Sequence, residues 1–169
     1  PVPTADPVAD MFGAAPRPFS RTLFRGSVQL AAAPAHAPAR LSADSRYVLW
    51  VNGHEVGRGP ARAQPARQRY DDYDLAPHLV AGANAVAVLV TYYGRANSFW
   101  MPPPGGGVGG DAALVFEAGL GDTELVSGEH WRVHRSTAWT QPADTGGGVH
   151  GVPVEVLDAR ELPAGWTGA

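Results

Sequence analysis

The sequence predicts an all-β protein with a single antiparallel β-sandwich of the jelly-roll type. Seven or eight short strand-like segments are separated by turn residues, which is the pattern of sandwich folds. Gly contributes 21 and Pro 16 of the 169 residues, so turns are frequent. No segment shows the 3.6-residue apolar period of a long amphipathic helix. Hydrophobic residues make up 44%, which is enough for one core in a chain of this length.

The segment 47–51 (YVLWV) predicts a strand because aromatic and branched side chains dominate it. Asn52-Gly53 follows directly. This pair favours a type I′ turn, which needs positive φ at both central residues, so residues 54–57 are the expected return strand of a hairpin.

Residues 85–92 are predicted to form the central strand of the protein. Val86, Val88 and Val90 would lie on one face, and the side chains that alternate with them are mostly apolar as well. A strand with two apolar faces is typical of a position covered on both sides.

The other elements are shorter. We expect Asp74 to cap a single helical turn over residues 75–79, and Trp131 and Val133 to point into the core from one strand. Strand character is also present in residues 23–30, 113–118 and 131–135, and more weakly in residues 39–43, 69–74, 123–126 and 154–157, so seven or eight of all these segments are expected to be strands.

The predicted domain organisation has three parts. Residues 1–20 form a flexible lead-in that is rich in proline, residues 21–158 form the sandwich, and residues 159–169 form a linker toward a C-terminal catalytic region outside this chain.

The charges exclude several classes of function. The net charge of −3 gives no overall attraction for nucleic acid or acidic lipid. All thirteen basic residues are Arg, so lysine Schiff-base chemistry and a Walker-type phosphate loop are excluded. The absence of Cys excludes disulfides, thiolate metal sites and a cysteine nucleophile. The longest strongly apolar run, residues 85–90, is too short to span a bilayer; the compartment, bacterial cytoplasm or secreted, is left open.

Several short motifs together resemble a known family. Asp74-Leu75, Leu79, Gly82 and Asn84, followed by alternating aliphatic residues, resemble galactose-binding-like β-sandwiches attached to glycoside hydrolases. The longer strings VNGHEVGRGPARAQPARQRYDDYDL (51–75) and TYYGRANSFWMPPP (91–104) resemble the N-terminal domain of bacterial α-L-rhamnosidases of glycoside hydrolase family 78. The resemblance covers residues 21–139, and more weakly residues 155–166.

This resemblance implies a non-catalytic accessory domain. In that family an (α/α)₆ barrel carries out catalysis, and no helical periodicity here matches such a barrel. The implied role is to pack on the catalytic domain of the same parent chain and to help bind L-rhamnose-containing glycans. The alternative is an autonomous carbohydrate-binding module, assisted by Ca²⁺ as in some related sandwiches. A purely structural interaction domain is a third hypothesis.

The start of the long Gly/Pro-rich loop carries the candidate sugar-binding residues. Aromatic rings can stack on a pyranose, while amide and guanidinium groups hold its hydroxyl groups. The alternative is that these aromatic residues anchor the loop by burying their rings. The candidates are Tyr92, Tyr93, Arg95, Asn97, Phe99 and Trp100.

Asp72 and Asp74 are the candidate metal ligands. In an extended segment both would lie on one face with Asp71 on the other, and Ca²⁺ prefers carboxylate oxygens. No other cofactor is expected. Asp74 also has a sufficient structural role as a helix cap.

Catalysis within the chain is the less favoured alternative. Glycosidases need two carboxyl groups about 5–10 Å apart, and the candidates are Glu55, Asp72, Glu117 and Glu129. His130 and His134, four residues apart, would be about 13 Å apart on a strand and could not share one metal ion.

Arginines gather in the segment that follows the predicted hairpin. We expect Arg58, Arg62 and Arg67 to lie in a solvated or interdomain loop, where they could reach carboxylates of the catalytic domain.

Overall fold

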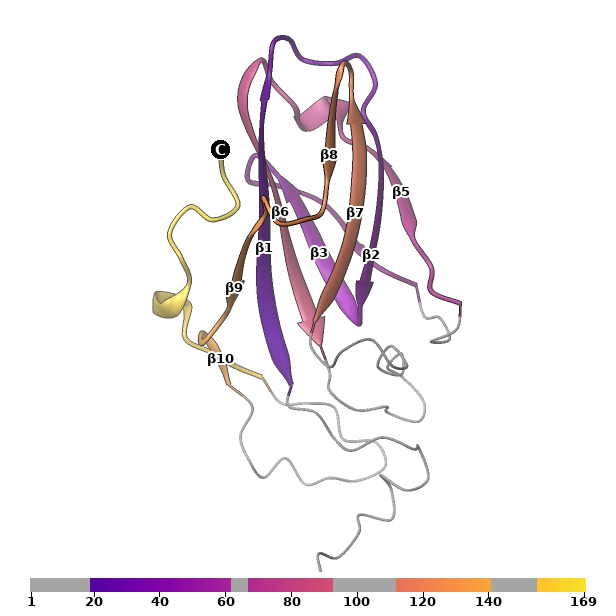
Figure 1. Ribbon diagram of the computed structural model, residues 1–169. Helices are drawn as coiled ribbons and strands as arrows, with labels where there is room; N and C mark the ends of the chain where they lie inside the picture. The colour runs from indigo at the N-terminus through magenta and orange to yellow at the C-terminus, as the bar shows by residue number, and fades with distance from the viewer. Residues whose placement is uncertain (1–18, 62–66, 93–111, 141–154) are drawn as a thin grey trace, which may run out of the picture.

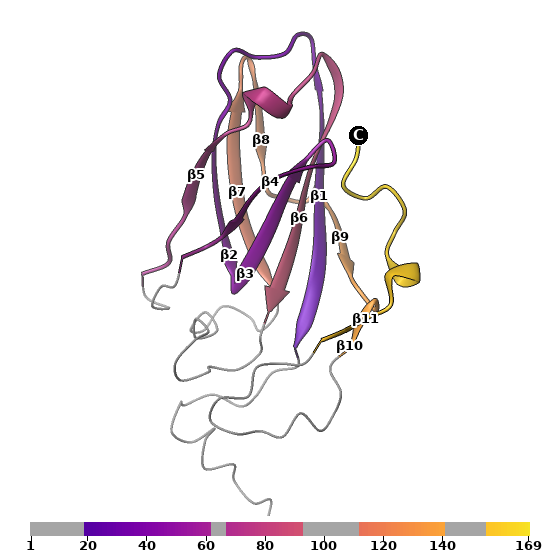
Figure 2. The same ribbon diagram turned by 180° about the vertical axis from the view of Figure 1, so that it is seen from behind.

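Two antiparallel sheets pack face to face in the computed structural model, which describes residues 19–61, 67–92, 112–140 and 155–169 (Figures 1 and 2). The five-stranded sheet has the order β4 (His54–Gly59), β3 (Arg46–Val51), β6 (Gly82–Tyr92), β1 (Ser20–Leu30) and β9 (Arg132–Arg135). The four-stranded sheet has the order β5 (Asp71–Asp74), β2 (Pro38–Asp44), β7 (Ala113–Leu120) and β8 (Thr123–Val126).

Short elements complete the described chain. They are the strand pair β10 (Trp139–Thr140) and β11 (Val156–Leu157) and the 3₁₀ turns η1 (Ala76–His78) and η2 (Ala159–Glu161). No helix among the described residues is long and apolar enough to cross a membrane. The predicted antiparallel β-sandwich is confirmed, whereas its assignment to the jelly-roll type stays a prediction.

The strand β6 is central, as its two apolar faces predicted. It pairs with β3 on one side and with the whole length of β1 on the other. Every side chain from Asn84 to the end of the strand is buried. Val86, Val88 and Val90 belong to the core between the sheets.

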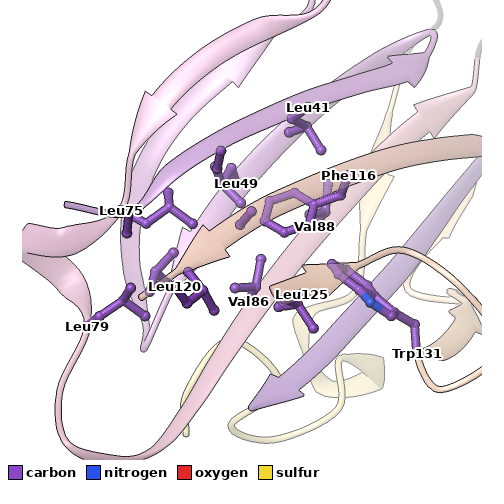
Figure 3. Packing of buried hydrophobic residues seen from close by; sticks show 14 of the residues in the cluster. Leu41, Leu49, Leu75, Leu79, Val86, Val88, Phe116, Leu120, Leu125 and Trp131 are labelled. Carbon is purple, nitrogen blue, oxygen red and sulfur yellow. The ribbon is translucent and has the colours of Figure 1, made fainter. Parts of the chain in front are cut away.

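The core fills the space between the two sheets (Figure 3). The Phe116 ring of β7 is fully buried in this core and meets the indole of Trp131 with ring centroids 5.4 Å apart. Gly26 on β1 makes this contact feasible, because a Cβ there would stand 2.6 Å from the indole. The core also contains Leu41, Leu49, Leu75, Leu79, Leu120 and Leu125.

The prediction that Trp131 and Val133 both point into the core is confirmed for Trp131 and wrong for Val133. Trp131 points into the core, but Val133 is 59% exposed. Trp131 precedes β9 and lies in a turn, where its backbone N–H donates to the Gly128 carbonyl. The alternation therefore does not run from Trp131 into β9, an edge strand whose four side chains are all exposed.

The prediction that Asp74 is the N-cap residue of the helical turn is wrong in its position. The N-cap position of η1 is Leu75, which makes no side-chain cap bond. Asp74 nevertheless accepts hydrogen bonds from the backbone N–H groups of Ala76 (3.0 Å) and Ala37 (2.9 Å). The carboxylate thus joins the turn to the segment before β2.

The β3–β4 hairpin has the predicted turn. Asn52 has φ 50° and Gly53 has φ 84°, both positive as a type I′ turn requires. The Asn52 side chain also makes hydrogen bonds to residues outside the hairpin. Its amide oxygen accepts from the N–H of Ala85 at 2.8 Å, and its Nδ2 donates to the His78 carbonyl at 2.9 Å.

The amide of Asn84 links this hairpin to the loop after η1. Its Oδ1 accepts from Asn52 Nδ2 (2.8 Å) and from the Val80 N–H (2.9 Å). Its Nδ2 donates to the carbonyls of Val80 (2.7 Å) and Gly82 (3.0 Å). Asn84 is only 2% exposed, so no water substitutes for these bonds readily.

We predict that Asn84→Leu lowers the free energy of unfolding by about 3 kcal/mol, because it leaves buried partners without hydrogen bonds. Urea unfolding monitored by tryptophan fluorescence measures this. Asp122→Asn, in the exposed β7–β8 turn, is the matched control and should change stability by less than about 0.5 kcal/mol. An equally small effect for Asn84→Leu would contradict the role of the amide.

The C-terminal segment 155–169 packs against the outer face of the five-stranded sheet. The indoles of Trp166 and Trp50 meet edge to face with centroids 5.2 Å apart. Gly53 donates its N–H to the Thr167 carbonyl at 2.7 Å, and Arg25 donates to the Gly168 carbonyl at 2.5 Å. Both views show this segment, in yellow, beside β9 and β1 (Figures 1 and 2). That these residues lead toward a catalytic region stays a prediction.

Trp166→Ala should loosen this segment, because it removes the edge-to-face contact and its buried area, worth about 1–2 kcal/mol. Amide hydrogen exchange at Gly53 should become faster, since its acceptor belongs to the segment. Glu161→Gln, exposed on η2, should leave the Gly53 rate unchanged. Equal rates in all three proteins would show that Trp166 does not hold the segment.

Candidate functional site

The outer face of the four-stranded sheet carries a row of charged side chains. Arg40 on β2 is paired in register with Asp72 on β5 and with Glu117 on β7. Alternation on each strand turns all three outward. The sheet thereby places an arginine between two carboxylates.

Arg40 contacts both carboxylates and an aromatic ring. Its Nε donates to Asp72 Oδ1 at 3.2 Å and its Nη1 to Glu117 Oε1 at 3.3 Å. Its guanidinium carbon lies 5.3 Å from the centre of the Tyr70 ring. The hydrogen bond to Asp72, followed by that to Glu117, raises the pKa of Arg40 above its usual range. More than half of each charged side chain is exposed, so these pairs add little to stability and stay accessible from solvent.

Two adjoining hollows lie on this face and share Arg40 and Glu117 in their walls. Their volumes are about 400 and about 480 Å³. We call them together the outer groove. The first also contains Pro38, Asp72, Glu124 and Val126, and the second Ser42, Asp44, Arg69, Tyr70, Ala113 and Val115.

The outer groove combines the groups that recognise neutral polyols. Tyr70, 56% exposed, offers an aromatic face, and Val115, 68% exposed, offers an apolar one. Arg40 supplies donors and the carboxylates supply acceptors for hydroxyl groups. Charges of both signs alternate, which does not suit a polyanion.

A partly buried phenol–carboxylate network lies on the inner side of β5. Tyr47 donates its hydroxyl to Asp71 Oδ2 at 2.5 Å and lies 2.8 Å from the Tyr73 hydroxyl. The glycines of β4 leave the space for it: a Cβ on Gly59 would stand 2.1 Å from Asp71, and one on Gly57 2.6 Å from Tyr73. The network joins β3 of one sheet to β5 of the other.

Burial, and secondly the Asp71 carboxylate, raises the pKa of Tyr47 well above its usual range. Burial likewise raises the pKa of Tyr73. The folded state therefore holds these protons more tightly than the unfolded chain does. The resulting stability is present below about pH 10, where unfolded tyrosine titrates, and is lost progressively as pH rises above it.

Tyr47→Phe should reduce that loss. We expect a lower free energy of unfolding at pH 7, by about 1–3 kcal/mol, since Asp71 loses a donor, together with a shallower decline between about pH 9.5 and pH 11. Urea unfolding at each pH measures both. Tyr70→Phe, on the exposed face, is the control and should follow the wild-type pH profile. Parallel profiles for Tyr47→Phe and wild type would contradict the assignment.

The predicted metal ligands Asp72 and Asp74 lie on one exposed face, as expected. Each already has a partner: Asp72 binds Arg40, and Asp74 accepts two backbone N–H groups, which lower its pKa. Among the described residues no group of three or more His, Asp or Glu side chains is placed to hold a metal ion. The Ca²⁺ hypothesis gains no support from this arrangement and stays a prediction.

Of the candidate sugar-binding residues, only Tyr92 lies among the residues that the structure describes. Tyr92 ends β6, where its side chain is 3% exposed, and its role toward a sugar stays a prediction. The other candidates, Tyr93, Arg95, Asn97, Phe99 and Trp100, lie outside the described residues, and their role stays a prediction.

The structure separates most of the candidate catalytic carboxylates. Glu55 accepts two hydrogen bonds from Arg58, at 2.7 and 2.9 Å, and these lower its pKa. Asp72 and Glu117 do come together, but with Arg40 between them on an open face. Glu129 lies in an exposed turn, and His130 and His134 are exposed. Among the described residues, Asp72 and Glu117 thus form an open pair bridged by Arg40, which differs from the two carboxyl groups that flank the bond in a glycosidase.

The arginine candidates for interdomain contact have different positions. Arg58 lies on β4 and is engaged by Glu55, Arg67 is exposed, and Arg62 lies outside the described residues. Their role in contact with another domain stays a prediction.

Sequence reasoning missed Tyr70, Arg40 and Val115 as parts of one site. The signal for Tyr70 was present, because the alternation of residues 69–74 places it on the face of Asp72. Arg40 and Val115 come from distant strands, and only the sheet register brings them beside it.

Comparison with solved structures identifies the type of domain. The chain is similar to a GH78 family rhamnosidase of Bacillus sp. GL1, with 34% identity and a TM-score of 0.70, over 90% of this chain and 15% of that one. It is also similar to an α-L-rhamnosidase of Streptomyces avermitilis solved with L-rhamnose, with 25% identity and a TM-score of 0.66, over 89% and 15%. The likeness to the Aspergillus terreus α-L-rhamnosidase, at 20% identity and a TM-score of 0.67 over 88% and 18%, concerns the fold alone.

The chain thus spans only about 15% of the length of the first rhamnosidases that it matches. No protein-family model matches it, and no match is found among curated proteins. The sequence resemblance to glycoside hydrolase family 78 is confirmed: the chain belongs with the β-sandwich domains of these enzymes.

Proposed function

We propose that the chain is a non-catalytic accessory domain of an α-L-rhamnosidase, which packs on the catalytic domain and helps to bind rhamnose-containing glycans. The observation that carries this proposal is the coverage: nearly the whole chain matches a small part of each rhamnosidase. Among the described residues, the candidate catalytic carboxylates Asp72 and Glu117 are both bound to Arg40 on an open face, which supports a non-catalytic role.

An autonomous carbohydrate-binding module is the second candidate. The outer groove favours it, because an exposed ring beside an arginine and two carboxylates is suited to sugar hydroxyl groups. In this alternative the module would bind saccharide without the catalytic domain. Assistance by Ca²⁺ remains part of this second candidate.

The proposal predicts that the chain alone does not release p-nitrophenol from p-nitrophenyl α-L-rhamnoside above the rate of a heat-denatured sample. It also predicts a stable complex when the chain is mixed with the separately produced remainder of the parent enzyme. Absorbance at pH 5–8 measures the first result, and gel filtration the second.

Two outcomes would overturn the proposal. Hydrolysis by the chain that is abolished in Asp72→Asn or Glu117→Gln would show catalysis within the sandwich. Separate elution, combined with unchanged activity and stability of a parent enzyme lacking this domain, would show that it is not an accessory part. Arg58→Ala tests the expected interdomain contact: this substitution should weaken the complex without unfolding the chain.

A further inference from the structure

The tip of the β3–β4 hairpin carries a dipeptide with a chemistry of its own. Asn52-Gly53 is the only Asn-Gly or Asp-Gly pair in the 169 residues of the sequence. When glycine follows asparagine, no side chain hinders the attack of the glycine nitrogen on the asparagine amide. The pair that forms the type I′ turn is therefore also the position of this sequence most prone to deamidation.

Deamidation at this position needs only water. The Gly53 backbone nitrogen loses its proton to solvent and attacks Cγ of Asn52. The new C–N bond forms as the Cγ–Nδ2 bond breaks, and ammonia leaves. Water then adds to one of the two carbonyl carbons of the resulting succinimide ring, which gives aspartate or isoaspartate at position 52. The reaction therefore requires that the Gly53 N–H and the Asn52 amide are both free.

The nitrogen of Gly53 is bound in the structure. It donates its N–H to the Thr167 carbonyl at 2.7 Å. In both views the turn lies beside the C-terminal segment 155–169, which supplies this acceptor (Figures 1 and 2). Gly53 itself is exposed, and a Cβ placed on it would meet nothing within 4 Å. Protection of this nitrogen thus comes from the hydrogen bond and not from surrounding side chains.

The amide of Asn52 is held by three partners outside the hairpin. Its oxygen accepts from the Ala85 N–H at 2.8 Å, and its Nδ2 donates to the His78 carbonyl at 2.9 Å and to Asn84 Oδ1 at 2.8 Å. Rotation of the amide toward Gly53 would break all three bonds. Because these bonds are partly buried, water does not replace them readily.

The product of deamidation does not suit this turn. A carboxylate at position 52 has no N–H donor, so the His78 carbonyl and Asn84 Oδ1 would each face a negatively charged oxygen. Isoaspartate also lengthens the backbone of a turn whose two central residues have φ 50° and 84°. Either product therefore destabilises the hairpin and its contact with residues 155–169.

We infer that Asn52 is a deamidation site and that residues 155–169 protect it. The segment keeps the Gly53 nitrogen bound through Thr167, and the contact between Trp166 and Trp50 holds the segment in place. Opening of the segment frees the nitrogen, so the rate of deamidation follows the fraction of molecules in which the segment is open. This inference concerns the lifetime of the folded sandwich and does not depend on the accessory role.

Peptide mapping by mass spectrometry tests the inference. The 169-residue chain is kept in mildly alkaline buffer, and the deamidated fraction at position 52 is followed over time. Trp166→Ala should raise the rate about tenfold, because the segment opens more often. Arg25→Ala removes the hydrogen bond to the Gly168 carbonyl and should raise the rate as well. Glu161→Gln, exposed on η2, should react at the wild-type rate.

Two further samples separate the parts of the inference. In the urea-unfolded chain, Asn52 should react at least about tenfold faster than in the folded wild type, and faster than Asn84 and Asn97, which do not precede glycine. Asn52→Asp places the carboxylate of the product in the turn, so it should lower the urea midpoint and speed amide hydrogen exchange at Gly53. Slow exchange at Val88 in the central strand reports that each variant is folded.

Equal rates in folded wild type, Trp166→Ala and Arg25→Ala would overturn the protective role of residues 155–169. Equal rates for Asn52 in the folded and the unfolded wild-type chain would overturn the inference as a whole, because the hydrogen bonds would then give no protection. An unchanged urea midpoint for Asn52→Asp would overturn the predicted effect of the product. In each of these cases the complex with the rest of the parent enzyme still decides the accessory role.

Discussion

The buried amide of Asn84 fixes the geometry on which the rest of the sandwich depends. It closes the loop between η1 and β6 through Val80 and Gly82, and it holds the β3–β4 turn through Asn52. Because a buried amide is stable only when its donors and acceptors are paired, these bonds set where β6 enters the sheet. The register of β6 then positions β1 and β3 on its two sides.

The two sheets of the sandwich differ in how their outer faces are packed. The five-stranded sheet contains the central strand and is packed on both sides, by the core and by residues 155–169. Among the described residues, the four-stranded sheet is packed on its inner side, where the Tyr47–Asp71–Tyr73 network ties it to the other sheet.

Successive side chains of a strand point to opposite faces of the sheet. One strand can therefore carry residues that pack inward and residues that line the outer groove. In β5, Asp71 and Tyr73 point inward into the partly buried network with Tyr47, while Asp72 and Asp74 point outward. A substitution on the outer set changes the groove with little effect on the core. The same separation holds on β7, where Phe116 lies in the core and Glu117 lies beside Arg40.

Local chemistry alone determined the antiparallel sandwich, the Asn52-Gly53 turn and the central place of residues 85–92, because alternation and turn geometry act over a few residues. The prediction that Val133 points into the core is wrong, because a turn at Trp131 interrupts the alternation. The prediction of a cap by Asp74 is correct only in part, because this carboxylate also accepts a long-range hydrogen bond from Ala37. Only the tertiary structure decided that Arg40, Asp72 and Glu117 meet, because sheet register joins residues up to 77 positions apart. The same holds for Tyr70 and Val115, which come from distant parts of the chain and line one hollow only in the folded protein.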